Sequence, residues 1–166
     1  MGRCLIVCES CFYGNTEKIT DAMAEVSKAR ICKTRQLEHL NLSDYGIIGL
    51  GSGIAYGRHY DILMEAASRS NLRGKNVFVF STSGTGNVQY NFALIDLLQK
   101  MGASVIGSFA CRGCDRFGPF RSMGGISEGH PDKYDLEAAR KFMIRTEKHY
   151  QDESLLSGKE KSAVRA

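Results

Sequence analysis

The sequence predicts an α/β fold in which helices cover both faces of a parallel β-sheet. Two observations carry this prediction: five short apolar segments recur along the chain, and amphipathic helical patterns lie between them. Alternation of this kind gives a parallel sheet, because each crossover between neighbouring strands passes through a helix. A length of 166 residues suits one such domain.

The five expected strands are residues 4–8, 30–35, 46–50, 76–80 and 103–109. Four of them are rich in Val, Ile, Leu and Phe without clean alternation, which is typical of strands buried on both faces. The segment at 30–35, R-I-C-K-T-R, is more polar and indicates a strand at the edge of the sheet.

Helices are expected at residues 16–29, 61–67, 92–101 and 133–150, where apolar residues recur at helical spacing. In the first of these segments, for example, the apolar residues are Ile19, Met23 and Val26. No such periodicity continues after Tyr150. We therefore expect a folded domain over residues 1–150 and a flexible C-terminal tail over residues 151–166.

The composition is that of a soluble globular protein, with 43% hydrophobic and 24% charged residues. No apolar segment approaches the roughly 20 residues of a membrane helix, and Cys8, Glu9 and Ser10 interrupt the first apolar segment too early for a signal peptide. We therefore expect a cytoplasmic protein without a membrane span. The six cysteines are then expected to be reduced, and the scattered basic residues behind the net charge of +4 predict no nucleic-acid partner.

Four of the expected strands end in polar, glycine-rich loops. Their sequences are S-C-F-Y-G-N-T, G-S-G-I-A-Y-G-R-H-Y, S-T-S-G-T-G-N and C-R-G-C-D-R-F-G-P-F. In an open parallel sheet the carboxyl ends of the strands meet at one edge, and ligands bind there where the strand order reverses. The four loops therefore predict a single ligand site.

The first loop has the composition of a phosphate site. Ser10, Asn15 and Thr16 offer side-chain hydrogen bonds, and Thr16 begins a helix whose free N–H groups favour an anion. No Lys or Arg lies between Cys4 and Thr16, so the loop is not a P-loop, which requires a lysine. It indicates a mononucleotide that is bound and not hydrolysed, or, equally, an ordinary capped turn.

The next two loops favour a flat ligand. Gly51, Gly53 and Gly57 allow the backbone to approach a ring system closely, and Tyr56 is placed to stack on one. The loop at 81–87 offers many N–H and hydroxyl donors to a polar ring edge. An ordinary, half-buried loop tyrosine remains the alternative for Tyr56.

Taken together, these motifs resemble the flavodoxin family over residues 3–150. The matching segments are S-C-F-Y-G-N-T-E-K-I, G-L-G-S-G-I-A-Y-G, F-S-T-S-G-T-G and C-R-G-C-D-R-F-G-P-F…G-G-I-S-E-G-H-P. The resemblance implies a flavodoxin-like, doubly wound, five-stranded parallel sheet of order 2-1-3-4-5 that binds FMN. Two features differ from the family: Ser10 lies four residues before Gly14, with Cys11 at the nearer position, and the chain is net positive where flavodoxins are typically acidic.

The resemblance also implies which residues bind FMN. Residues 10–16 would hold the phosphate, residues 52–57 would lie against one side of the flavin, residues 81–86 would line its pyrimidine edge, and residues 111–115 would lie near the ring. The cofactor-binding residues implied in this way are Ser10, Tyr13, Gly14, Asn15, Thr16, Ser52, Gly53, Ile54, Ala55, Tyr56, Gly57, Ser81, Thr82, Ser83, Gly84, Thr85, Gly86, Cys111, Gly113 and Asp115.

The function implied is that of an FMN-binding electron carrier that shuttles electrons between redox partner proteins, as a monomer or a homodimer. The alternative is an FMN-dependent oxidoreductase acting on a quinone or a porphyrinogen. It is suggested by G-S-G-I-A-Y-G-R-H-Y, which resembles a loop of the menaquinone-dependent protoporphyrinogen oxidases. Those enzymes carry a long insertion that is missing after residues 81–87.

No catalytic triad or general-base constellation is visible, so no catalytic residue is expected. His59 lies beside the loop at residues 52–57. It either tunes the flavin or a quinone pocket or is an ordinary polar surface residue. A third hypothesis is a flavin-free regulator or metal–thiolate protein, since Cys8-x-x-Cys11 and Cys111-x-x-Cys114 have ligand-like spacing. The two pairs would lie three strands apart, roughly 14 Å, which disfavours a shared metal.

Overall fold

A parallel sheet of five strands forms the centre of the protein, whose computed structural model describes residues 3–163, with the backbone alone for residues 158–163. The strands of this sheet are β1 (Arg3–Glu9), β2 (Arg30–Cys32), β3 (Tyr45–Ala55), β5 (Asn76–Ser83) and β6 (Ser104–Arg112). Their order, β2-β1-β3-β5-β6, confirms the predicted 2-1-3-4-5 arrangement. A short sixth strand, β4 (Arg58–His59), pairs antiparallel with the end of β3.

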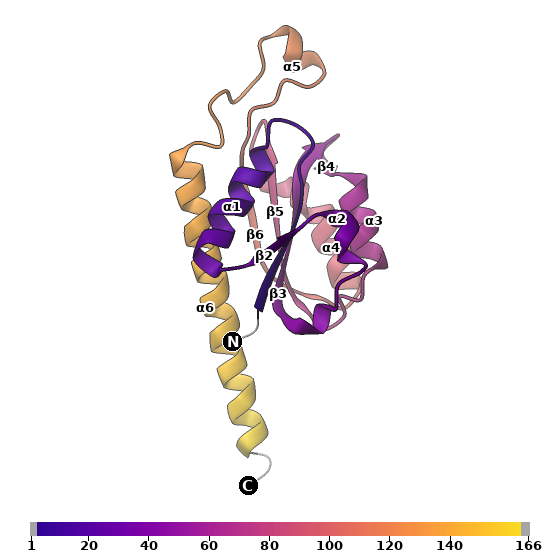
Figure 1. Ribbon diagram of the computed structural model, residues 1–166, viewed down its shortest axis with the longest axis vertical. Coiled ribbons are helices and arrows are strands. Elements are labelled where there is room, and N and C mark those ends of the chain that lie inside the picture. The colour runs from indigo at the N-terminus through magenta and orange to yellow at the C-terminus, as the bar shows by residue number, and fades with distance from the viewer. Residues whose placement is uncertain (1–2, 164–166) are drawn as a thin grey trace.

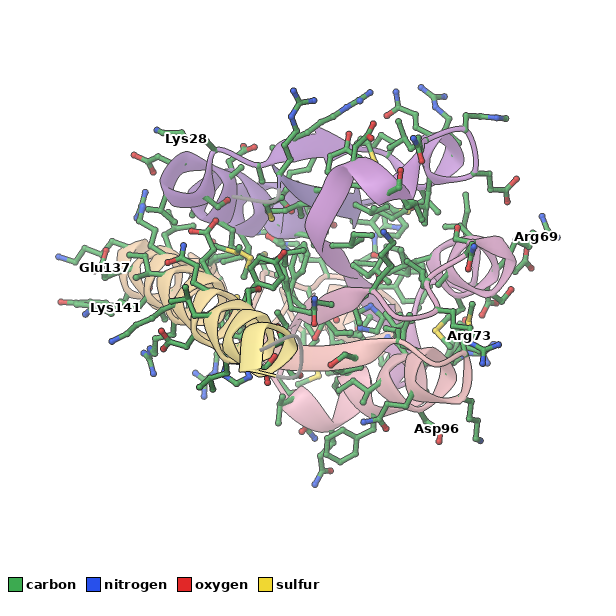
Figure 2. The ribbon with its side chains drawn as sticks, turned by 90° about the horizontal axis from the view of Figure 1, so that it is seen from below. Lys28, Arg69, Arg73, Asp96, Glu137 and Lys141 are labelled. Carbon is green, nitrogen blue, oxygen red and sulfur yellow. The ribbon has the colours of Figure 1, made fainter. Side chains whose placement is uncertain are left out.

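Helices cover both faces of the sheet, as the sequence predicts (Figure 1). The helices on one side are α1 (Asn15–Ser27) and α6 (Lys133–Ala163), and those on the other are α2 (Thr34–Leu37), α3 (Asp61–Arg69) and α4 (Phe92–Lys100). The short elements η1 (Leu42–Asp44), η2 (Val88–Asn91) and α5 (Pro119–Ser122) lie in the connections. Charged side chains such as Arg69, Asp96 and Lys141 point outward from these helices, away from the sheet (Figure 2).

Alternate residues of the strands enter two separate cores. Leu5 and Val7 of β1 belong to the core beneath α3 and α4, whereas Cys4 and Ile6 belong to the core beneath α1 and α6. Both faces are therefore buried, which explains why the strands are apolar without alternation.

The glycines of β3 make room for aromatic rings of β5. A Cβ added at Gly49 would lie 2.2 Å from Cζ of Phe78, and one at Gly51 would lie 2.2 Å from Cζ of Phe80. Gly51 therefore serves the core, and the expectation that it admits a ligand is wrong. β3 continues as a strand to Ala55, five residues beyond the apolar segment that marks it in the sequence, because Ser52 and Gly53 pair with β5 and the last two residues pair with β4.

The C-terminal helix is longer than its sequence pattern indicates. It continues past Tyr150 to Ala163 and extends beyond the end of the sheet (Figure 1). The flexibility expected for residues 151–166 stays a prediction, and residues 164–166 lie outside the described part of the chain. Over residues 3–163, none of the helices combines the length and the apolar character that crossing a bilayer requires.

Candidate functional site

A cleft of about 1160 Å³ opens at the carboxyl ends of the strands. It is bordered by the β1–α1 loop, the β3–β4 hairpin, the loop after β5 and the segment between β6 and α6. The four polar loops do therefore converge. The predicted site residues that line this cleft are Tyr13, Asn15, Thr16, Gly53, Ile54, Ala55, Tyr56, Gly57, Thr82, Ser83, Gly84, Thr85, Gly113 and Asp115.

The remaining predicted residues lie next to the cleft without lining it. They are Ser10, Gly14, Ser52, Ser81, Gly86 and Cys111. Ser52, Ser81 and Cys111 are buried within their strands, because β3, β5 and β6 run further than their apolar segments suggest. Gly86 packs against the backbone of Arg112, where an added Cβ would lie 3.0 Å from the amide nitrogen.

The start of α1 provides free backbone donors at one end of the cleft. Tyr13 and Gly14 both adopt left-handed conformations, with φ of 57° and 65°, and no side chain caps the helix. The first-turn N–H groups of α1 are thus left for solvent or an anion. Next to them, the hydroxyls of Thr16 and Thr82 lie 2.8 Å apart and join α1 to the end of β5.

The β3–β4 hairpin holds an aromatic side chain at the mouth of the cleft. Ala55 pairs with Arg58, so Tyr56 and Gly57 form a two-residue turn, and their φ angles of 52° and 78° are those of a type I′ turn. The Tyr56 side chain is 93% exposed although it lines the cleft. A tyrosine held in the left-handed region and left uncovered is available to stack on a ligand.

His59, a residue of β4, ties this hairpin to the rest of the protein. Its side chain is 1% exposed, and its Nε2 lies 3.0 Å from Oδ1 of Asn91. Because Nδ2 of Asn91 donates to Ser108 Oγ and to the Phe109 carbonyl, Oδ1 must accept from His59, which fixes the proton on Nε2. Nδ1 is then the acceptor, and the Ser52 hydroxyl shares its proton between this nitrogen, at 2.8 Å, and the Gly53 carbonyl, at 2.7 Å.

Burial also keeps His59 neutral. Desolvation lowers the pKa of the imidazole to about 4, and the hydrogen bond with Asn91 opposes this only partly. His59 is buried, so the interpretation as an ordinary surface residue is wrong. It does not line the cleft, and a role in tuning the flavin or a quinone pocket stays a prediction. Asn91 carries no recognisable signal in the sequence, since its partners meet it only in the folded chain.

The segment between β6 and α6 forms a lobe, residues 116–125, that stands beyond the edge of the sheet (Figure 1). At its base, Asp115 and Ile126 form an antiparallel bridge with N–H···O distances of 3.0 and 2.8 Å. The base is anchored on the β1–α1 loop, because Nδ2 of Asn15 donates to the Cys114 carbonyl at 2.8 Å.

The lobe and its surroundings complete the cleft with residues that are not among the individually predicted cofactor-binding residues, although most of them belong to the four polar loops. These additional lining residues are Phe12, Tyr60, Tyr90, Cys114, Arg116, Phe117, Gly118, Pro119, Phe120, Arg121, Gly124 and Ile126. The Phe12 ring lies 6.1 Å from the Phe117 ring, so the β1–α1 loop and the lobe also meet through aromatic contact.

The cysteines do not form a shared site in the part of the chain that is described. Cys8 and Cys111 are buried in the core, where desolvation raises the pKa of the thiols to about 11 and about 12. Cys11 is exposed, and Cys114 is half-buried in the wall of the cleft. Among the described residues, the group of side chains close enough together to hold a metal ion contains no cysteine, so the structure does not favour a metal–thiolate protein.

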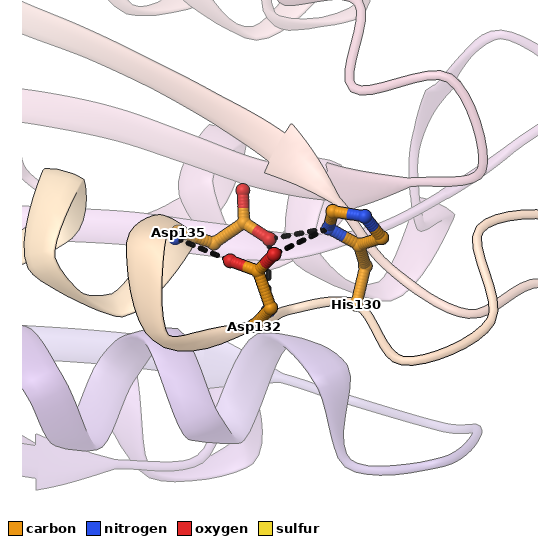
Figure 3. A group of neighbouring side chains, drawn as sticks. All are labelled: His130, Asp132 and Asp135. Atoms are coloured by element: carbon orange, nitrogen blue, oxygen red, sulfur yellow. Dashed lines mark hydrogen bonds and ion pairs between the residues drawn. The ribbon is translucent and has the colours of Figure 1, made fainter.

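The side chains of His130, Asp132 and Asp135 form a cluster at the start of α6, where they cap the helix (Figure 3). Oδ1 of Asp132 accepts from the N–H groups of Tyr134 and Asp135, and Oδ2 of Asp135 accepts from the N–H of Asp132 at 2.9 Å. This is a reciprocal capping box. Nδ1 of His130 lies 2.6 Å from the same Asp135 oxygen. The three side chains thus begin the helix and provide each other's partners.

The buried state of His59 predicts a specific loss of stability in acid. The unfolded chain takes up a proton on histidine below pH 6.5, whereas the folded protein excludes it down to about pH 4. The stability that neutral His59 provides is therefore complete above pH 6.5 and is lost as the pH falls to about 4. The loss amounts to about 3 kcal/mol in the free energy of unfolding.

Urea unfolding at pH 7.5, 5.5 and 4 measures this loss. His59→Gln is expected to be less stable than the wild type at pH 7.5 and to lose less stability between pH 7.5 and 4. His149→Gln, at an exposed position on α6, is the matched control and should keep the wild-type pH dependence. An unchanged pH dependence in His59→Gln would contradict the assignment.

Comparison with known proteins agrees with this geometry. A family model described as a flavodoxin domain matches residues 6–110. The uncharacterized protein MJ0298 of Methanocaldococcus jannaschii is 31% identical over 142 residues, which cover 84% of this chain and 95% of that protein.

Solved structures show the same fold at low identity. A flavodoxin from the domain Archaea superimposes with a TM-score of 0.63 at 15% identity, covering 90% of this chain and 99% of its own. Oxidised Flavodoxin 2 from Bacillus cereus gives 0.64 at 20% identity, with coverage of 89% and 99%. A Fusobacterium nucleatum flavodoxin mutant bound to flavin mononucleotide gives 0.60 at 12% identity, with coverage of 90% and 98%. Because the family model matches more than half of the length of this chain, the chain belongs to the flavodoxin-domain family.

Proposed function

We propose that this protein is an FMN-binding electron carrier that passes electrons between redox partner proteins. One observation carries the proposal: the cleft joins the uncapped start of α1 to an exposed aromatic hairpin, in a chain of the flavodoxin-domain family. A phosphate group and a flat ring system are the ligand parts that these two ends suit.

The residues present fit FMN. The N–H groups of α1, with Asn15 and Thr16, offer donors to the phosphate, and Tyr56 offers a ring face to the isoalloxazine. Gly84 and Thr85 bring backbone and hydroxyl donors to the opposite wall. The volume of about 1160 Å³ exceeds the roughly 300–1,000 Å³ of most small-molecule sites, so a flavin nucleotide has room.

The chain's own residues would bind and orient the flavin rather than act on a substrate. FMN, when bound, supplies the capacity to accept and release electrons, and the protein sets its access and potential. Among the described lining residues, the Asp115 carboxylate accepts the N–H of Phe117 at 2.8 Å and so helps to shape the lobe. Burial raises the pKa of the Tyr60 hydroxyl to about 12, so it holds its proton.

These groups favour a carrier over an enzyme. His59, behind the hairpin, is neutral, and both of its ring nitrogens are engaged by Ser52 and Asn91. No particular contact supports the alternative of an oxidoreductase for quinones or porphyrinogens, and we do not pursue it. The partner proteins, the cytoplasmic location and the choice between monomer and homodimer stay predictions of the sequence.

The visible spectrum of the purified protein tests the proposal. After incubation with FMN and gel filtration, we expect the absorption bands of oxidised flavin to elute with the protein in a ratio near one per chain, because the cleft encloses one ring system. Bovine serum albumin carried through the same steps is the control for loose adsorption. A protein that elutes colourless at every FMN concentration would overturn the proposed function.

The stacking role of Tyr56 gives a second prediction. Tyr56→Leu is expected to weaken FMN binding about three- to tenfold, because an aromatic pair contributes about 0.5–1.5 kcal/mol beyond its buried area. The quenching of flavin fluorescence measures the dissociation constant. Tyr134→Leu is the matched control, since Tyr134 is 71% exposed on α6 and does not line the cleft. Equal affinities for both variants and the wild type would rule out stacking on Tyr56.

A further inference from the structure

Tyr60 lines the cleft with a half-buried side chain whose hydroxyl has no partner in the described part of the chain. The hydrogen bonds that Tyr60 forms there involve its backbone. Its N–H donates to Oγ of Ser52 at 3.2 Å, and its carbonyl accepts from the N–H of Leu63, in the first turn of α3, at 3.0 Å. A buried tyrosine hydroxyl usually finds a hydrogen-bond partner, so a partner in the cleft is expected.

Gly53 fixes the position of this hydroxyl. A Cβ added at Gly53 would lie 2.3 Å from Oη of Tyr60 and 2.7 Å from its Cζ. The phenol group of Tyr60 therefore lies directly against the backbone of β3, in space that only a glycine leaves open. Since Gly53 itself lines the cleft, Oη lies at the cleft wall and not at its outer rim.

The hydroxyl lies on the side of the sheet that faces α1. A Cβ at Gly51 would meet Phe80, which belongs to the core beneath α1 and α6, and Gly53 follows two residues later on the same face. Gly53 pairs with Thr82 of β5, about 4.8 Å away at the usual strand spacing. The Thr82 hydroxyl in turn lies 2.8 Å from that of Thr16. These contacts connect the Tyr60 hydroxyl to the start of α1.

This hydroxyl is a hydrogen-bond donor at neutral pH. Burial raises the pKa of Tyr60 to about 12, and Cys11 and Asp115 contribute to the increase. Cys11 belongs to the β1–α1 loop, and Asp115 lies at the base of the lobe. A protonated hydroxyl without a protein partner can donate to an oxygen of a ligand.

The position of the hydroxyl indicates which part of the ligand it meets. The start of α1 suits the phosphate, and Tyr56 at the tip of the hairpin suits the ring system. Gly53 lies in the strand that leads to the hairpin, and its neighbour Thr82 is bonded to α1. A ligand that joins the two ends therefore passes the Tyr60 hydroxyl. In FMN, the segment between the phosphate and the ring is the ribityl chain, which carries hydroxyl groups.

We propose that the Tyr60 hydroxyl donates a hydrogen bond to the ribityl chain of the flavin nucleotide and makes the site selective for a hydroxylated chain. This inference rests on the proposed function and adds one ligand-binding residue to it. The backbone of Tyr60 is already held by Ser52 and by the first turn of α3, so little ordering is needed when the ligand binds.

An FMN analogue that keeps the phosphate, with an unsubstituted pentyl chain in place of the ribityl chain, makes the test selective. The dissociation constants of FMN and of this analogue are measured by the quenching of flavin fluorescence for the wild type and Tyr60→Phe. Phenylalanine removes the hydroxyl and keeps the ring. Tyr150→Phe is the matched control, because Tyr150 is also half-buried but packs against the core beneath α1 and α6.

Tyr60→Phe is expected to raise the dissociation constant of FMN about three- to tenfold, as for the loss of one hydrogen bond. The constant of the analogue should change less than about twofold, since its chain offers no oxygen to the hydroxyl. Tyr150→Phe should match the wild type with both ligands. An equal loss for both ligands would assign Tyr60 to the phosphate, the ring or the fold, and this result, or no loss for either ligand, would overturn the proposal. A wild-type protein that does not bind FMN would instead overturn the proposed function itself.

Gly53→Ala tests the same contact if Tyr60→Phe does not fold. The added methyl group would lie 2.3 Å from Oη of Tyr60 and must displace the hydroxyl while the tyrosine remains. In the wild type the analogue should bind more weakly than FMN, and Gly53→Ala should reduce this preference about three- to tenfold. An unchanged preference for FMN in the folded Gly53→Ala variant would exclude the Tyr60 hydroxyl as a ligand of the chain.

Discussion

Parallel pairing of β1 with β3, of β3 with β5 and of β5 with β6 is the constraint on which the cleft depends. It places four carboxyl ends at one edge of the sheet, so loops that are far apart in the sequence become neighbours. The pairing is stable because both faces of the sheet are buried, and Gly49 and Gly51 are part of that burial. They leave the space that Phe78 and Phe80 occupy, and this keeps β3 close to β5 up to the edge where the hairpin begins.

Each wall of the cleft is then held from the rigid part of the molecule. The β3–β4 hairpin rests on His59 and Asn91, and Asn91 in turn is bonded to β6. The start of α1 is tied to β5 through Thr16 and Thr82. The lobe is attached at its base while its outer part stands free of the sheet (Figure 1). These rigid walls are suited to orienting a ring system.

The sheet order and the position of the site could be predicted from the sequence, because buried parallel strands are apolar and their polar loops must meet at one edge. Ser52 and Ser81 were placed in loops, since a serine that ends a strand looks the same in sequence as one that begins a loop. The approach of the lobe to the start of α1 could not be predicted, because it depends on the contacts of Asn15 with Cys114 and of Phe12 with Phe117 in the folded chain. Similarly, the residues after Tyr150 show no helical period in the sequence, although α6 continues through them to Ala163.

A spectroelectrochemical titration of the FMN-loaded protein tests most directly the proposal that this chain carries electrons. A carrier that exchanges single electrons with partner proteins should show two resolved one-electron midpoint potentials, both shifted from those of free FMN by the cleft walls. A single two-electron transition at the potential of free FMN would contradict this account. It would mean that the cleft holds the flavin without controlling its redox chemistry.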